Sequence, residues 1–292
     1  MNLINIKSNL LSVIIPVLNE ELLLPRAINS AKRLGVEIFI LDSGSTDNTV
    51  KLSETAGCIV HQGLWGSFSE KLNWGLTELP ILTPWVIRLD ADEYLTETLI
   101  NEINSGILES VGNHIDGFWI DRHIFFMGKR IRFGGQGAQP NVRIMRVGHT
   151  KYEQRLTDEH VLAKGQFSKL RGAIVDDPDR GLAAWLRKHV AYAETESFSA
   201  YRLKKESTWR NLHGSAKFRR FLKEKIYNSL PKFLRPTIFF IYRYIFLFGF
   251  LDGYRGAIFH FLHAFWYRFI IDALILESEI TNGKFVKKTN VM

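Results

Sequence analysis

The chain has 292 residues, of which 46% are hydrophobic and 23% are charged. These values are typical of a globular protein, and the length suits one large domain with an appended piece or two modest domains. The formal net charge of +8 indicates an anionic partner, a class that includes nucleic acid, acidic lipid and phosphorylated substrates. Cys58 is the sole cysteine, which excludes a disulfide within the chain.

The first hundred residues alternate between predicted strands and predicted helices. Apolar runs rich in β-branched residues predict buried strands at residues 10–17, 36–41, 58–60 and 85–89. Apolar side chains at helical spacing predict helices over residues 22–34, 46–56 and 71–79. This alternation favours an α/β fold, a Rossmann-like and mainly parallel sheet with helices on both faces.

Three polar clusters follow predicted strands, at residues 16–20, 42–47 and 90–93. In a parallel sheet the carboxyl ends of the strands share one edge, where ligands bind. We therefore expect the three clusters to meet at one site.

The chain changes character after residue 110. Residues 110–175 have a mixed pattern with short predicted strands, and residues 182–212 read as a charged helix. Two apolar, aromatic runs follow at 238–251 and 257–276. Charged residues interrupt both, so neither reaches the roughly 18 uninterrupted apolar residues of a spanning helix. Because basic residues precede them, we expect a helical element at a membrane surface. A buried helical hairpin or a contact between copies of the chain is the alternative.

Asp90 and Asp92 end the fourth predicted strand. Two carboxylates at this spacing can bind a hard divalent cation, Mg²⁺ or Mn²⁺, together with phosphate oxygens and water. The alternative is an acidic first turn of a helix, which the helix dipole stabilises.

The three clusters, in this order and spacing, resemble the motifs of inverting GT-A glycosyltransferases of family 2. Residues 14–20 are similar to the end of that family's first strand, 41–47 to the end of its second, and 88–93 to its Asp-x-Asp motif. The resemblance covers the first third of the chain. The sequence is also similar to bacterial transferases of the lipopolysaccharide core and surface polysaccharides. We expect a GT-A domain over residues 10–212 and a basic, aromatic helical tail over 213–292.

The resemblance implies roles for individual residues. A nucleotide-sugar site would comprise Pro16, Val17, Asn19, Glu20, Asp42, Gly44, Lys71, Asp90 and Ala91. Asp92 would bind the metal, with Asp90 beside it and His160 as a further ligand. A solvated helix lysine is the alternative for Lys71, and a structural hydrogen bond is the alternative for His160. The chain lacks the histidine that related enzymes carry near residue 175, which leaves the third protein ligand open.

Inverting transfer needs a base that deprotonates the acceptor hydroxyl. The family takes it from a later acidic pair, which corresponds to Asp158 and Glu159 here. Glu159 is the better aligned candidate and Asp158 is the alternative.

The resemblance therefore implies transfer of a sugar from a UDP- or GDP-sugar to a lipid-linked oligosaccharide or lipopolysaccharide core. A non-catalytic, membrane-associated scaffold with a transferase-like domain is the alternative. Residues 1–10 lack the features of a signal peptide, so we expect a cytoplasmic protein, peripheral on the inner face of the cell membrane. A nucleic-acid partner is not expected, because the acidic clusters would repel phosphate unless a metal intervened. A dinucleotide oxidoreductase is not expected either, because no Gly-x-Gly-x-x-Gly follows the first strand.

Overall fold

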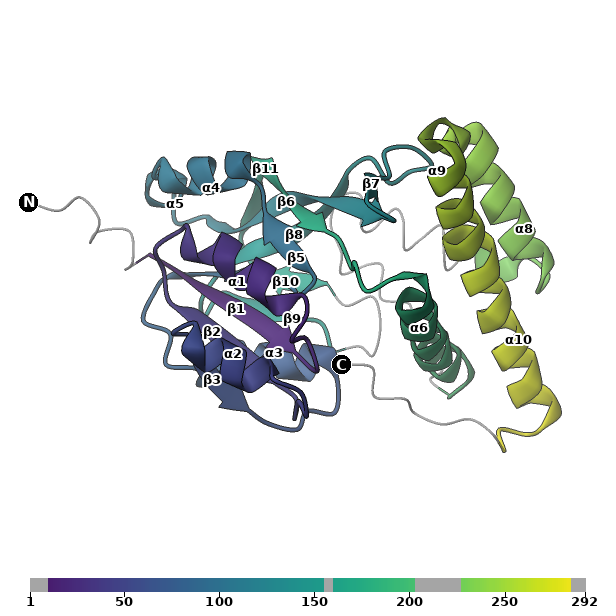
Figure 1. Ribbon diagram of the computed structural model, residues 1–292, viewed down its shortest axis with the longest axis horizontal. Coiled ribbons are helices and arrows are strands. Elements are labelled where there is room, and N and C mark those ends of the chain that lie inside the picture. The colour runs from purple at the N-terminus through teal and green to yellow at the C-terminus, as the bar shows by residue number, and fades with distance from the viewer. Residues whose placement is uncertain (1–9, 155–159, 203–226, 285–292) are drawn as a thin grey trace, which may run out of the picture. The chain divides into compact units, whose positions relative to one another are not determined.

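The computed structural model describes residues 10–154, 160–202 and 227–284, which form two compact units (Figure 1). The first unit runs to Ile131 and resumes over Gln136–Gly181. The second contains Arg132–Gly135 and the chain from Leu182 onward. The expected domain boundary at residue 212 falls outside the described residues and stays a prediction.

A nine-stranded sheet forms the centre of the first unit, and its main path has the order β3-β2-β1-β4-β8-β6-β11-β5. The strands β3, β2, β1 and β4 are mutually parallel, as their apolar sequences predict. Their bounds are β1 Leu11–Val17, β2 Ile38–Asp42, β3 Ile59–Gln62 and β4 Trp85–Arg88.

The remaining strands make the sheet mixed rather than mainly parallel. β8 is antiparallel to both β4 and β6, β6 is parallel to β11, and β5 is antiparallel to β11. Their bounds are β5 Glu93–Leu95, β6 Ile115–Phe126, β8 Gln139–Arg146 and β11 Gln166–Asp176. β7 Lys129–Arg130 pairs with β6, and β9 Thr150–Tyr152 pairs with β10 Val161–Ala163. The prediction of an α/β fold is confirmed.

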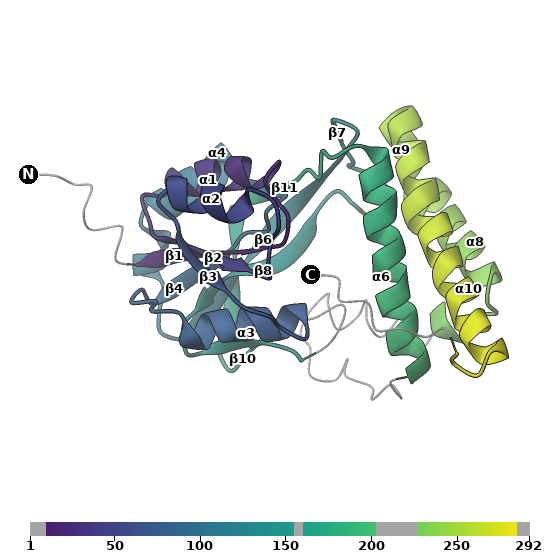
Figure 2. The same ribbon diagram turned by 60° about the horizontal axis from the view of Figure 1, so that its bottom comes forward.

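Helices cover both faces of this sheet (Figure 2). On one face, Val13 and Ile15 of β1 pack in the same core as α1 and α4. On the other face, Ile14 shares a core with Leu79, which follows α3. This alternation is what a strand buried on both sides requires. The bounds are α1 Leu24–Lys32, α2 Thr49–Thr55, α3 Phe68–Glu78, α4 Glu97–Asn104 and α5 Ile107–Ser110.

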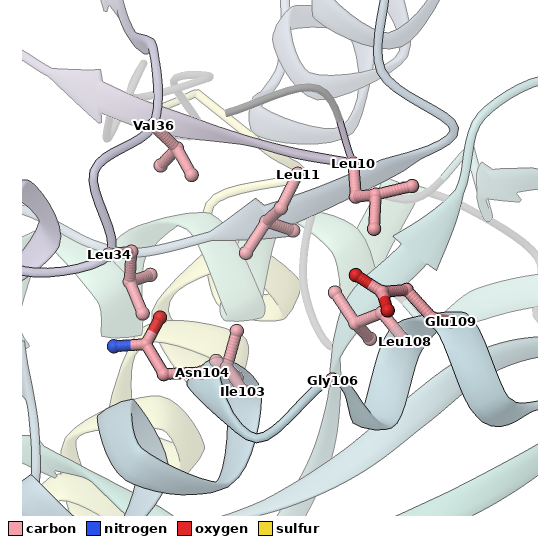
Figure 3. A pocket seen from close by; sticks show the side chains of 9 residues that line it. All are labelled: Leu10, Leu11, Leu34, Val36, Ile103, Asn104, Gly106, Leu108 and Glu109. Carbon is pink, nitrogen blue, oxygen red and sulfur yellow. The ribbon is translucent and has the colours of Figure 1, made fainter. Parts of the chain in front are cut away.

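A small apolar hollow lies at the amino end of β1 (Figure 3). Leu10 and Leu11 line it together with Leu34, which follows α1, and Leu108 of α5. The three polar motifs follow the carboxyl ends of their strands instead. The hollow is therefore at the opposite end of the strands from the expected site.

The second unit is helical. Its core contains Ala193 of α6 and Tyr267 and Ile271 of α10. A buried ion pair also joins Arg235 of α8 to Asp272 of α10, with Nε to Oδ1 at 2.9 Å. The bounds are α6 Leu182–Arg202, α8 Leu234–Ile241, α9 Gly253–His260 and α10 Tyr267–Ile280. Short 3₁₀ and π-helical turns cover Tyr227–Ser229, Tyr242–Phe246, Gly249–Asp252 and Phe261–Trp266.

One continuous helical stretch in the second unit, Gly249–Ile280, is 32 residues long. By length and composition alone it meets the requirement for crossing a membrane, a requirement that core helices of soluble proteins also meet. The apolar run 257–276 lies wholly within this stretch, and Arg268 and Asp272 interrupt it, whereas most of the run 238–251 precedes the stretch. Length and composition do not distinguish a spanning helix from an interfacial one.

Candidate active site

The strand register places the three sequence motifs at one edge of the sheet. Val17, the last residue of β1, lies opposite Asp42, the last residue of β2. On the other side of β1, the amide of Leu89 donates to the carbonyl of Ile14 at 3.0 Å, immediately before Asp90. The expectation that the motifs share an edge is confirmed by this pairing.

The first and second motifs are joined by hydrogen bonds. Asn19 adopts a left-handed backbone conformation with φ of 54°, which asparagine tolerates better than most residues. Its amide donates to Ser45 Oγ at 2.8 Å, and its Oδ1 accepts from the amide of Thr46 at 2.8 Å. The amide of Glu20 donates to Thr49 Oγ1 at 2.8 Å. These contacts fix the loop after β1 against the turn after β2.

Asp42 is completely buried and closes its own turn. Its carboxylate accepts from the amides of Gly44 at 3.2 Å and Ser45 at 3.1 Å, and from Gln62 Nε2 at 3.0 Å. Gly44 has φ of 92°, a conformation that glycine adopts without strain. Asp42 therefore organises the turn, and its contact with a nucleobase stays a prediction.

Lys71 is buried, with 1% of its surface exposed, so the solvated-lysine alternative was wrong. From α3 its Nζ donates to the carbonyl of Val17 at 2.9 Å and to Ser43 Oγ at 2.6 Å. The ammonium also lies 5.4 Å from the ring centroid of Trp65. Burial lowers the pKa of Lys71 to about 8, although Asp42 and Asp90 oppose the shift. Lys71 thus connects the ends of β1 and β2 from beneath the site.

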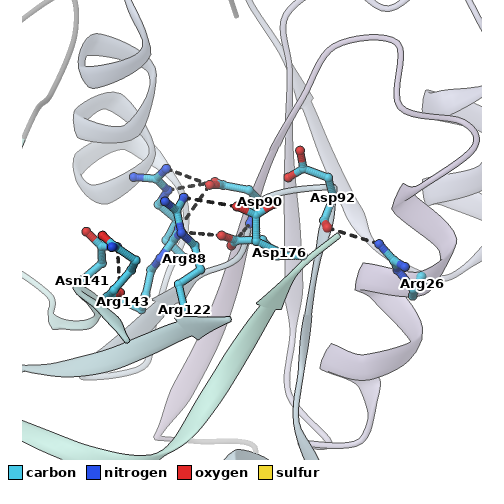
Figure 4. A network of polar contacts seen from close by, with 10 residues as sticks. Arg26, Arg88, Asp90, Asp92, Arg122, Asn141, Arg143 and Asp176 are labelled. Atoms are coloured by element: carbon cyan, nitrogen blue, oxygen red, sulfur yellow. Dashed lines mark hydrogen bonds and ion pairs between the residues drawn. The ribbon is translucent and has the colours of Figure 1, made fainter. Parts of the chain in front are cut away.

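Two arginines hold Asp90 (Figure 4). Arg88 Nε and Arg88 Nη2 each donate to its carboxylate at 2.9 Å, and Arg143 Nη1 donates at 3.3 Å. Burial opposes the ionised form, but the two guanidinium groups outweigh it and hold the pKa of Asp90 well below its usual range. Asp90 is therefore a fixed anion whose oxygens are already hydrogen-bonded.

Glu93 lies behind Asp90 and is 1% exposed. It accepts from Arg143 Nη2 at 2.5 Å and from the amide of Asp90 at 3.0 Å. Burial raises the pKa of Glu93 to about 8, against the opposing effect of Arg143. Glu93 is thus a supporting residue of the acidic motif.

The carboxylate of Asp92 lies apart from that of Asp90 and the two arginines that hold it (Figure 4). Its backbone is held from both sides. Arg26 Nη2 donates to the carbonyl of Asp92 at 3.2 Å, and the amide of Asp177 donates to the same carbonyl at 3.1 Å. The motif thus presents its two aspartates to different surroundings.

Several charged residues that were not predicted from the sequence surround the acidic motif. Arg143 comes from β8, and Arg122 of β6 lies 3.4 Å from the carboxylate of Asp176 in β11. Arg88 comes from the strand of the motif itself. The available signal was an arginine within an otherwise apolar predicted strand, since such a residue needs a buried partner.

The acidic motif can hold a divalent cation through one carboxylate. Among the described residues, no three His, Cys, Asp or Glu side chains are grouped to bind a metal. Mg²⁺ commonly takes one or two protein carboxylates and completes its shell with phosphates and water. Asp92 fits such an ion, whereas Asp90 is occupied by its arginines. His160 is described only at the edge of a gap, where its carbonyl accepts from the amide of Glu153 at 2.8 Å, and its metal role stays a prediction.

Asp158 and Glu159 lie outside the described residues. The assignment of the catalytic base to either one therefore stays a prediction.

Comparison with known proteins finds a family match in the first half of the chain. Residues 12–152 match the model of a family described as Glycosyl transferase family 2. An uncharacterized glycosyltransferase of Rickettsia typhi is 37% identical over 94 residues, which are 32% of this chain and 31% of that protein. The lipopolysaccharide core biosynthesis glycosyltransferase LpsC of Rhizobium meliloti is 29% identical over 167 residues, 55% of this chain and 60% of LpsC. The chain thus spans less than two thirds of the length of these curated relatives.

Two solved structures are also similar. TarS 1–349 of S. aureus in complex with UDP-GlcNAc has a TM-score of 0.47 and 14% identity, over 94% of this chain and 93% of that one. Glucosyl-3-phosphoglycerate synthase of Mycobacterium tuberculosis, in complex with Mn²⁺, UDP and glucosyl-3-phosphoglycerate, has a TM-score of 0.30 and 25% identity. That match covers 41% of this chain and 45% of that one.

Proposed function

Because residues 12–152 match the model of glycosyl transferase family 2, we propose that the protein is an inverting glycosyltransferase of this family. It transfers a sugar from a UDP- or GDP-sugar to a hydroxyl of a lipid-linked oligosaccharide or lipopolysaccharide core, with Mg²⁺ or Mn²⁺. The observation that carries the proposal is the meeting of three motifs at one sheet edge, with Val17 opposite Asp42 and Leu89 bonded to Ile14. LpsC, a transferase of lipopolysaccharide core biosynthesis, supports the acceptor class.

In this proposal the chain binds the donor at the edge formed by residues 16–20 and 42–47, and Asp92 holds the metal. When bound, the cation offsets the charge that develops on the leaving diphosphate. Glu159, or alternatively Asp158, takes the proton of the acceptor hydroxyl. The hydroxyl oxygen then attacks the anomeric carbon from the face opposite the diphosphate, which inverts the configuration.

The test of the metal assignment is the variant Asp92→Asn, assayed for transfer and for hydrolysis of UDP- and GDP-sugars with Mn²⁺. Transfer should fall at least about 100-fold, in the range that loss of a charge-stabilising group causes. Glu97→Gln is the matched control, because Glu97 is an exposed acid of the same unit that pairs with Arg33. Unchanged transfer by Asp92→Asn contradicts the metal assignment. No activity of the wild type with any donor favours the non-catalytic scaffold.

We further propose that the second unit binds the inner face of the cell membrane, where a lipid-linked acceptor lies. Eight large apolar side chains between Ile241 and Tyr254 are 40% to 69% exposed, far more than an isolated surface residue explains. They are Ile241, Tyr242, Ile245, Phe246, Phe248, Phe250, Leu251 and Tyr254. Aromatic side chains of this kind suit the boundary between lipid headgroups and acyl chains.

Sedimentation with anionic phospholipid vesicles tests the membrane proposal. The double variant Phe246→Ser/Tyr254→Ser should lose most of its vesicle binding. Leu82→Ser is the matched control, since Leu82 is 92% exposed in the first unit. If wild type and double variant sediment equally, the face does not bind lipid. A dimer in solution that the double variant abolishes would assign the face to contact between copies.

A further inference from the structure

Arg180 is bonded to the first of the three motifs, residues 16–20. It lies in the turn that follows β11, where the amide of Arg180 donates to the carbonyl of Pro178 at 2.8 Å. Its Nη1 donates to the carbonyl of Asn19 at 3.1 Å, and its Nη2 pairs with the carboxylate of Glu20. The side chains of Arg180 and Glu20 are 29% and 18% exposed. The ion pair is therefore partly accessible to a ligand.

The same turn is also hydrogen-bonded to the acidic motif, residues 90–93. The amide of Asp177 donates to the carbonyl of Asp92 at 3.1 Å. The carboxylate of Asp177 accepts from Arg26 Nη1 at 2.9 Å. The turn thus extends from the acidic motif to the first motif, and it carries a guanidinium group to the edge where the donor is expected.

Arg180 differs from Arg88, Arg143 and Arg26 in what holds it. Arg88 and Arg143 are 15% and 4% exposed and are bonded to Asp90. Arg26 donates to the carboxylate of Asp177 and to the carbonyl of Asp92, and its Cζ lies over the Tyr94 ring, 4.7 Å from the ring centroid. Arg180 is held instead by Glu20, a carboxylate that is itself expected to bind the nucleoside. A ligand that engages Glu20 competes directly for the partner of Arg180.

The chemistry of the edge calls for such a cation. Glu20, Asp42, Asp90 and Asp92 lie at or just after the ends of β1, β2 and β4. The cations already described there, Lys71, Arg88 and Arg143, are buried or bonded to Asp90, so a diphosphate needs a more accessible cation. A guanidinium group can donate two parallel hydrogen bonds to phosphate oxygens, and charge-assisted bonds of this kind are stronger than neutral ones.

We propose that Arg180 binds the diphosphate of the nucleotide-sugar donor, exchanging the carboxylate of Glu20 for phosphate oxygens when the donor enters. This inference rests on the proposed function. It assigns to the turn after β11 a binding residue that lies outside the three sequence motifs.

The test compares nucleosides with their diphosphates by titration calorimetry, using uridine, UDP, guanosine and GDP, first with MgCl₂ and then with EDTA. The variants are Arg180→Ala, Arg180→Lys and the control Arg33→Ala. Arg33 also forms an exposed pair with a glutamate, Glu97, in the same unit. Arg180→Ala should bind the preferred diphosphate at least about 10-fold more weakly, the effect expected of a lost bond to a charged group. Its affinity for the matching nucleoside should be unchanged, and Arg180→Lys should recover part of the loss.

Two results would overturn the inference while the proposed function stands. Arg180→Ala could bind UDP and GDP as the wild type does, which would exclude a phosphate contact. It could instead lose nucleoside and diphosphate binding equally, which would assign Arg180 to positioning Glu20. If the wild type binds none of the four ligands, the proposed function itself is contradicted.

Discussion

Substituting the buried Lys71 by methionine should change how the stability of the protein depends on pH. Lys71 is 1% exposed, and burial lowers its pKa from 10.5 to about 8. The unfolded chain therefore holds this proton more tightly than the folded protein does. In the wild type, the charged lysine destabilises the fold below pH 8, and this penalty is relieved as the pH rises from about 8 to 10.5.

The size of the effect follows from the shift. One pKa unit corresponds to about 1.4 kcal/mol, so the full penalty is about 3 kcal/mol, and about 2 kcal/mol of it is relieved by pH 9.5. Methionine has no titrating group, and the other groups of the protein titrate alike in both proteins. The stability of the wild type relative to Lys71→Met should therefore rise by about 2 kcal/mol between pH 7 and pH 9.5.

Urea denaturation at several pH values between 7 and 9.5 measures this difference. Methionine also leaves the carbonyl of Val17 and the hydroxyl of Ser43 without their donor, which adds a nearly constant offset. Only the pH dependence of the difference is diagnostic. Lys51→Met is the control, because it removes a cation from the exposed face of α2 and no buried one. Parallel pH profiles for wild type and Lys71→Met would refute the reasoning.

Two further changes test the packing and the chemistry. Gly172→Ala should destabilise the protein by about 1–3 kcal/mol in urea denaturation, because the new methyl group would lie 2.3 Å from the backbone of Leu99; wild-type stability would show that β11 can move away from α4. Glu159→Gln should lower the rate of transfer by at least about 100-fold without weakening UDP binding, as expected for loss of a general base. If Asp158→Asn has this effect and Glu159→Gln does not, the base is Asp158.

The parallel half of the sheet could be predicted from sequence, because its central strands β1 and β2 are apolar runs buried on both faces. All seven residues of β1 are buried, and β2 is buried throughout. The edge that carries the motifs follows from that pattern alone. The sequence also indicated the polar turn at Asp42, since a glycine with a left-handed backbone is needed two residues later.

The mixed half of the sheet, formed by β8, β6, β11 and β5, could not be predicted, because its strands have mixed exposure. The twelve residues of β6 include both buried and partly exposed positions, so no simple alternation appears. The partners of Asp90 were missed for a related reason. Arg143 lies 53 residues away in sequence, and only the pairing of β4 with β8 brings it to the motif.

The sequence around a residue also does not show whether segments distant in the chain bury its side chain. From its position in the predicted helix, Lys71 could be either a solvated lysine or a residue of the nucleotide site. In the structure, the ends of β1 and β2 and the turn that follows β2 bury it. In the second unit, the apolar run 257–276 lies inside a helical stretch over Gly249–Ile280, whereas most of the run 238–251 lies before it, in α8 and the π-helical turn that follows.

A thermal-shift panel of nucleotide sugars, measured with Mn²⁺, tests most directly whether this fold is a donor-binding transferase. A ligand that binds only the folded protein raises its stability by mass action, by about 2.7 kcal/mol when its concentration is 100 times Kd. We expect at least one UDP- or GDP-sugar to raise Tm in a concentration-dependent way, and Asp92→Asn to reduce the shift. No shift with any donor, in the presence of Mn²⁺, would contradict a nucleotide-sugar site at this edge of the sheet.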